Sequence, residues 1–139
     1  MSPRRSAVQF WDTSALVALI FREPHTAKAL EAKEQAERYL AWNWLQIEAH
    51  AALARRGATQ EHLRYLRTLL NPFQYIAVDA EDHPAIIKLL EKHRLRAADA
   101  GHLFCLKQAK KLLSDIQFVC LDDELTHAAE AERIRVFGD

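Results

Sequence analysis

The chain has 139 residues, half of them hydrophobic and 27% charged, an ordinary globular composition that is long enough for one domain with a real core. Nineteen basic residues balance nineteen acidic ones, so the overall charge points neither toward nucleic acid nor away from it. No apolar stretch approaches about 20 residues and no signal-peptide pattern opens the chain, which predicts a cytoplasmic protein without a membrane partner.

Short apolar runs alternate with helical patterns along the chain. In chain order, we expect a strand over 6–11, helices over 15–21 and 24–38, a strand over 39–42, helices over 44–56 and between Thr59 and Asn71, a strand over 73–78, helices between Asp82 and Arg94 and over 97–112, a strand over 116–121, a helix over 123–132 and a strand over 134–137. Strands with continuous apolar runs, set between helices, indicate a parallel sheet covered on both faces. We therefore predict a single α/β/α sandwich over residues 1–139, with a central, mostly parallel sheet of about five strands.

Four carboxylates lie at the ends of apolar segments or inside them. Asp12 ends the run 7–11 and Asp122 ends the run 116–121, whereas Glu48 and Asp99 lie within apolar helical stretches. An ionised acid against apolar walls is costly unless it is paired, hydrogen-bonded or bound to a cation. Because ligands of open α/β sheets bind beyond the carboxyl ends of the strands, we expect these four acids to converge at that edge.

Such a cluster suits a divalent cation. Mg²⁺ and Mn²⁺ prefer carboxylate and water oxygens, and a cation held in this way can activate a water and neutralise a phosphate oxygen. Phosphodiester hydrolysis needs both effects. Thr13 or Ser14 can cap the first helix, and its hydroxyl can orient a water or a carboxylate. Zinc and serine-hydrolase motifs such as HExxH, CxxC and GxSxG are absent from the sequence.

Each acid also has an ordinary structural explanation. Asp12 and Asp122 can each cap the helix that follows, and Asp123 competes with Asp122 for any role. Glu48 can pair with Arg55 or Arg56. Asp99 is the hardest to explain structurally, because the small residues around it leave room for a ligand.

Other residues near the acids have simpler explanations. We expect His50 and His102 to be packing or surface residues, and Trp42 and Trp44 to lie in the core. A basic group can either follow a phosphate backbone near Asp99 or form a solvated helix face; its members are Arg94, Arg96, Lys107, Lys110 and Lys111.

With these residues in place, nearly all of the chain resembles the PIN domain family, specifically the VapC-like toxins of bacterial and archaeal type II toxin–antitoxin pairs. The motifs that carry the resemblance are WDTSAL at 11–16, QIEAH at 46–50, LRAADAGHL at 95–103 and FVCLDDEL at 118–125. Family members often have Ser or Thr two residues before the last acid, where this chain has Cys120. A thiol is a weaker hydrogen-bond donor, so Asp122 is expected to be held less firmly.

The resemblance implies a metal-dependent endoribonuclease that uses Mg²⁺ or Mn²⁺ and leaves 5′-phosphate and 3′-hydroxyl ends. It implies that Asp12 and Asp99 ligate the metal directly, that Glu48 is a third ligand or positions the attacking water, and that Asp122 binds a second metal or its waters. It also implies a homodimer, held inactive by a cognate antitoxin in a larger hetero-oligomer. The amphipathic first helices are the expected docking place of that antitoxin.

Two other functions fit the same residues. A non-catalytic PIN-like module would bind RNA or a protein partner, and Cys120 is the feature that favours it. A metal phosphohydrolase would act on small phosphate esters and leave RNA intact. Activity on RNA, metal binding that depends on Asp12 and activity on a phosphomonoester distinguish the three.

Overall fold

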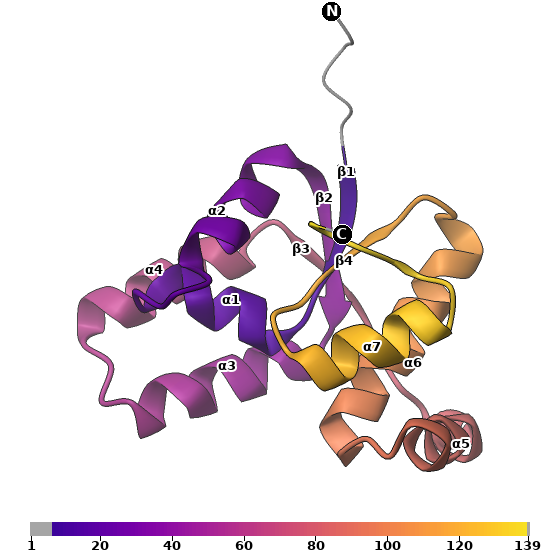
Figure 1. Ribbon diagram of the computed structural model, residues 1–139. Helices are drawn as coiled ribbons and strands as arrows, with labels where there is room; N and C mark the ends of the chain where they lie inside the picture. Colours follow the sequence, from indigo (N-terminus) through magenta and orange to yellow (C-terminus); the bar gives the residue numbers. More distant parts are fainter. Residues whose placement is uncertain (1–6, 139) are drawn as a thin grey trace, which may run out of the picture.

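Five parallel strands form the centre of the structure (Figure 1). The computed structural model describes residues 7–138. The strands are β1 (Ala7–Trp11), β2 (Ala36–Trp42), β3 (Phe73–Ile76), β4 (Gln117–Val119) and β5 (Arg135–Val136). They follow the order β3-β2-β1-β4-β5, and each neighbouring pair is parallel. The predicted α/β/α sandwich with a parallel sheet is confirmed.

Helices cover both faces of this sheet (Figure 1). On one face lie α1 (Thr13–Ile20), α2 (Thr26–Gln35), α3 (Trp44–Arg55) and α4 (Gln60–Leu70); on the other lie α5 (His83–His93), α6 (Ala97–Leu112) and α7 (Asp123–Ala131), with a short 3₁₀ turn over Ala80–Asp82 before α5. Strand direction therefore brings the carboxyl ends of β1 and β4 and the amino ends of α1, α3, α6 and α7 to one edge of the sheet.

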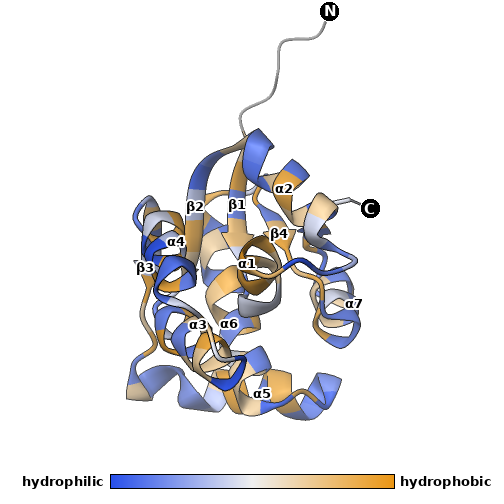
Figure 2. Ribbon diagram, turned by 90° about the vertical axis from the view of Figure 1, so that its left-hand side faces the viewer, coloured by the Kyte–Doolittle hydropathy of each residue, from blue (hydrophilic) through white to orange (hydrophobic). Residues whose placement is uncertain are grey.

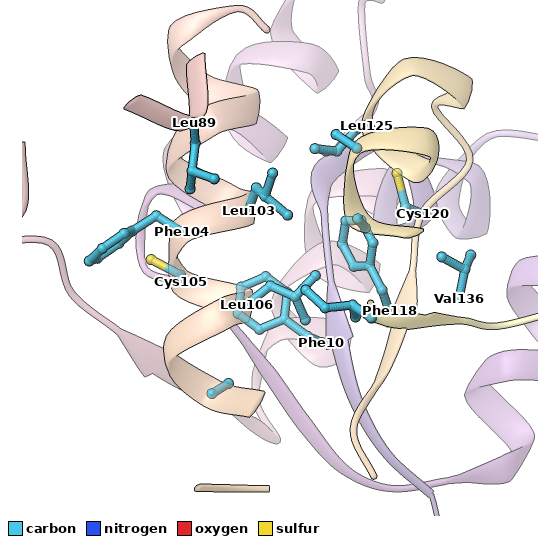
Figure 3. Packing of buried hydrophobic residues seen from close by; sticks show 14 of the residues in the cluster. Phe10, Leu89, Leu103, Phe104, Cys105, Leu106, Phe118, Cys120, Leu125 and Val136 are labelled. Atoms are coloured by element: carbon cyan, nitrogen blue, oxygen red, sulfur yellow. The ribbon is translucent and has the colours of Figure 1, made fainter. Parts of the chain in front are cut away.

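The alternation of side chains along the strands divides the apolar residues into two cores. Phe10 and Phe118 point toward α5, α6 and α7, with their ring centroids 6.2 Å apart, and pack with Leu103 and Leu125 (Figure 3). Trp11, one residue further along β1, points to the opposite face and packs among the first four helices. A strand with apolar side chains on both faces can be stable only in the middle of such a sandwich.

Helix α1 is nearly buried in the core that contains Trp11. Its residues Ala15–Leu19 are each at most 8% exposed, and α1 packs against α2, α3 and α4. Figure 2 shows α1 as an apolar helix in front of the sheet, with more hydrophilic helix surfaces around it. Within the described part of the chain, every helix is too short or too polar to cross a bilayer.

Several predicted boundaries are wrong. The second helix ends at Gln35 rather than at residue 38, because residues 36–38 belong to β2, where Ala36 and Arg38 pair with Ala7 and Val8 of β1. The later strands end sooner than predicted, and residue 6 lies outside the described residues. Thr13 and Ser14 do not cap α1, because the helix already begins at Thr13 and Asp12 is its N-cap.

Candidate active site

Asp12 stands at the carboxyl end of β1, where the strand leads into α1. Its backbone N–H donates to the carbonyl of Val119 at 3.2 Å, so the pairing with β4 continues through it. Its Oδ1 accepts hydrogen bonds from the Ser14 hydroxyl at 2.7 Å and the Ala15 amide at 3.4 Å, and the residue is only 4% exposed. Burial raises the pKa of Asp12, although the charge of His102 opposes it. Asp12 is therefore both a helix cap and a nearly buried acid.

Glu48 is joined to two other elements through a single oxygen. Its Oε1 accepts from Thr13 Oγ1 at 3.0 Å and from His102 Nε2 at 2.5 Å. Burial acts to raise the pKa of Glu48, but the bonds from His102 and Thr13 outweigh it and lower the pKa. The alternative pairing with Arg56 is wrong, because that guanidinium pairs with Glu23 at 2.5 Å.

Asp99, in the first turn of α6, is the acid on which the other three act. Burial is the largest cause of its raised pKa, which reaches about 6. The charges of Asp122, Asp12 and Glu48 raise it further. The charge of His102 opposes them. Carboxylates on four separate elements thus interact at one edge of the sheet.

Asp122 follows β4 and caps α7, because its Oδ1 accepts from the Leu125 amide at 3.1 Å. Cys120 Sγ accepts from the Asp122 amide at 3.4 Å and lies 3.6 Å from the Asp122 carbonyl oxygen, so the thiol contacts the backbone of this acid. Ser14 Oγ accepts from the Leu121 amide at 2.9 Å while it donates to Asp12. The hydroxyl of Ser14 therefore ties the first acid to the turn that carries the fourth.

Asp123 faces a different surface. It is exposed and lines a cavity with His25, Thr126 and His127, between α7 and the turn before α2. Its charge is not among those that shift the pKa of Asp99, whereas that of Asp122 is. Electrostatically, Asp122 is thus the one of these two acids that acts on Asp99.

His102 belongs to this group although we expected only a packing or surface role for it. The residue is 2% exposed, and its ring lies edge-on to Trp42 with centroids 5.1 Å apart. Its Nε2 bonds to Glu48, and its Nδ1 has no hydrogen-bond partner within residues 7–138. The sequence held one sign of this, because His102 follows Asp99 by three positions on the same helix, where side chains lie on one face.

Two of the basic residues considered for phosphate binding are engaged elsewhere. Lys107 Nζ lies 2.6 Å from Glu132, and Lys110 Nζ donates to the carbonyl of Arg133. Arg96 is exposed at the N-cap of α6, three residues before Asp99. Among these three, Arg96 is the side chain placed at the amino end of α6.

The donor set of this edge suits a hard divalent cation. Asp12, Glu48, Asp99 and Asp122 offer carboxylate oxygens, which Mg²⁺ and Mn²⁺ prefer over nitrogen or sulfur ligands. Within residues 7–138, no three His, Cys, Asp or Glu side chains are grouped as direct ligands of one ion. Mg²⁺ is usually held by one or two carboxylates and several waters, so the residues present fit it. A cation here would also relieve the repulsion that raises the pKa of Asp99.

Comparison with known proteins agrees with the fold. The chain is similar to the protein in the crystal structure of PAE2754 from Pyrobaculum aerophilum, with a TM-score of 0.58 and 23% identity over 89% of this chain and 87% of that chain. No curated protein matches the sequence. The family model described as PIN domain matches residues 10–131, from β1 to the end of α7. PIN domains are generally nucleases and typically use divalent metals. With this match over most of its length, the chain belongs to the PIN domain family.

Proposed function

We propose that this protein is a metal-dependent endoribonuclease. The single observation that carries the proposal is that four acids from different elements lie at one edge of the sheet. Thr13 bonds to Glu48, and Ser14 joins Asp12 to the turn that carries Asp122. Burial raises the pKa of Asp99, and the charges of Asp122, Asp12 and Glu48 raise it further. Repelling charges at one edge of a sheet are costly without a cation, and a site that binds a cation among carboxylates suits phosphodiester chemistry.

Asp12 and Asp99 would hold Mg²⁺ or Mn²⁺ directly. When bound, the cation would neutralise phosphate oxygens and make a nearby water more acidic. Glu48 would be a third ligand or would orient the attacking water, and Asp122 would hold a second ion or its waters. Water would attack phosphorus as the bond to the 3′ oxygen breaks and that oxygen takes a proton, which leaves 5′-phosphate and 3′-hydroxyl ends.

The remaining polar residues would position these acids. Ser14 holds Asp12 through Oδ1 at 2.7 Å, and Thr13 holds Glu48 through Oε1 at 3.0 Å. A fixed carboxylate loses less entropy on meeting substrate than a mobile one. The thiol of Cys120 accepts from the backbone of Asp122, so this position contacts the fourth acid despite the change from Ser or Thr.

Within this proposal, the protein is a cytoplasmic toxin of the VapC-like type that forms a homodimer and is inhibited by an antitoxin. The antitoxin would not dock on α1 itself, because that helix is buried and offers little free surface. A cavity of about 160 Å³ lies between α1, α2 and α4, lined by residues that include Leu16, Lys33 and Tyr65. An apolar side chain of an antitoxin would enter this cavity.

The test compares RNA cleavage by the wild type with cleavage by variants that each lose one acid. Wild-type protein with Mg²⁺ or Mn²⁺ should cleave RNA, and Asp99→Asn should abolish cleavage while its circular dichroism spectrum stays that of the wild type. Asp122→Asn should strongly reduce cleavage, whereas the matched Asp123→Asn variant should retain it. Equal cleavage by wild type and Asp99→Asn would refute the proposal, and activity on a phosphomonoester without activity on RNA would favour the phosphohydrolase.

A further inference from the structure

Trp44 is exposed beside the acids, although we expected it in the core. It is the first residue of α3, and 43% of its surface is open to solvent. Ile47, one turn along the same helix, is 55% exposed. Large apolar groups held in solvent next to a site are candidates for contact with a ligand.

The indole of Trp44 is held in place by a second indole. It stacks against Trp42 at the end of β2, with ring centroids 6.0 Å apart and planes inclined by 28°. Trp42 is in turn fixed against α6, because a Cβ at Gly101 would lie 2.5 Å from its ring. Glycine at this position therefore allows the close approach that supports the stacked pair.

The stacked pair is continuous with the acidic residues. The ring of Trp42 contacts His102 with centroids 5.1 Å apart, and His102 bonds to Glu48 at 2.5 Å. Trp44 also precedes Glu48 by four positions on α3, which places the two on one side of the helix. A polymer whose phosphate lies at the acids would thus have an adjoining nucleotide near Trp44.

We propose that Trp44 stacks on an unpaired base of the RNA, next to the phosphodiester that is cut. This inference rests on the proposed ribonuclease function and adds a residue that contacts the substrate beside the cut. Every nucleobase has a flat π-face, so an aromatic ring binds bases with little sequence preference. A paired base cannot offer that face without leaving its helix, so the base on Trp44 would be unpaired.

A second copy of this chain fits the surface less well. A stable interface buries about 800 Å² on each partner, whereas a Trp side chain contributes about 150–250 Å² when wholly buried. In the described part of α3, Trp44 and Ile47 are the large apolar residues that are exposed. Two partly exposed side chains supply a small part of a dimer interface but enough surface for one base.

The experiment measures binding separately from cleavage. A fluorescent single-stranded RNA 12-mer of mixed sequence is titrated, in anisotropy, with Asp99→Asn protein that also carries Trp44→Ala, Trp44→Phe or Tyr65→Ala. Trp44→Ala should weaken binding roughly 5- to 150-fold, in line with the loss of one stacked base. Trp44→Phe should retain most of the affinity, and Tyr65→Ala, which removes a ring that is 38% exposed on α4, should bind as the parent does. Melting curves check that each variant is folded.

A second ligand tests for the base itself. A 12-mer of abasic nucleotides should bind the Asp99→Asn parent more weakly than the normal RNA, and Trp44→Ala should show little difference between the two. Equal affinity of the parent and Trp44→Ala for normal RNA would overturn the inference. The inference would also be overturned if Trp44→Ala changed the mass of the protein in light scattering but left its RNA affinity unchanged. Trp44 would then be a contact between subunits. If wild-type protein cuts no RNA but binding still depends on Trp44, the ribonuclease proposal fails and the stacking site stands.

Discussion

His102 Nε2 lies 2.5 Å from Glu48 Oε1, a contact that joins the middles of two motifs separated by 54 positions. Since the pKa of Glu48 is lowered by this partner, the carboxylate is ionised and the imidazole donates the hydrogen bond. The contact holds Glu48 toward Thr13 and toward the other acids. It gives the acidic edge a positively polarised partner inside the protein.

Replacing His102 should therefore impair catalysis without removing an acid. Partners that orient metal-binding carboxylates typically contribute about 10- to 100-fold to activity or metal affinity. We expect His102→Ala to lower kcat by about that factor with little change in KM, and His102→Gln to recover part of it through an amide donor. The control is His50→Ala, since His50 is exposed and bonds only to the Gln46 carbonyl of its own helix turn among the described contacts. An unchanged kcat in His102→Ala would show that the contact only packs the fold.

The raised pKa of Asp99 predicts how the metal-free protein responds to pH. Its folded pKa is about 6 against an ordinary 3.8, so between these values the folded state holds a proton that the unfolded state has lost. Stability from this group is present below pH 4 and is lost as pH rises through 6, by at most about 3 kcal/mol. Asp99→Asn should lack this loss and should unfold at higher urea than wild type at pH 7 without metal. Identical urea unfolding curves for wild type and Asp99→Asn at every pH from 4 to 7 would contradict this prediction.

The same shift predicts the pH dependence of metal binding. A cation needs the ionised carboxylate, so metal affinity should rise as pH increases through about 6. Calorimetry with Mn²⁺ at pH 5 and pH 7 measures the difference directly. As a control, Asp99→Asn should bind Mn²⁺ weakly at both pH values. If this variant bound Mn²⁺ as tightly as the wild type, Asp99 would not be a metal ligand.

Two substitutions at Asp12 separate its cap role from its proposed metal role. Asparagine caps helices about as well as aspartate, so Asp12→Asn should fold normally but lose most of the rise in Tm that Mg²⁺ or Mn²⁺ produces in the wild type. Asp12→Ala should lose that rise and also about 1 kcal/mol of stability with the cap. Differential scanning fluorimetry with and without metal shows both effects. A full metal response in Asp12→Asn would leave Asp12 with the cap role alone.

Glu132 provides a test of stability away from the acids. Its side chain is 8% exposed and accepts from Lys107 at 2.6 Å and Lys92 at 2.7 Å. These bonds lower the pKa of Glu132 to about 2, so its contribution is present above pH 4.5 and is lost as pH falls toward 2. We expect Glu132→Gln to cost about 1–2 kcal/mol at pH 7, because both lysines are partly solvated, and to leave RNA cleavage per folded molecule unchanged. Loss of cleavage in a folded Glu132→Gln protein would show that Glu132 also takes part in RNA binding or cleavage.

At the end of α2, a local helical pattern competes with pairing in the sheet, and the sheet prevails. The pattern of residues 24–38 is rich in Ala, Glu and Lys and predicts one helix, but the last three residues belong to β2, which pairs with β1. Backbone pairing with a distant strand is not encoded in local propensity. In contrast, the helix over 97–112 has its predicted bounds. Its start is set locally, because α5 ends at Arg94, whose backbone is left-handed.

By itself, the sequence determined the class of fold and drew attention to four acids, because apolar runs of strand length and carboxylates at their ends are local features. Only the tertiary structure decided which side chains meet. It placed Asp122 where its charge acts on Asp99, and it placed Asp123 in a cavity that His25 also lines. It also brought His102 to Glu48 and left Trp44 in solvent against Trp42. These contacts depend on how the helices pack on the sheet. Local sequence patterns do not encode which residues, far apart in the chain, come into contact.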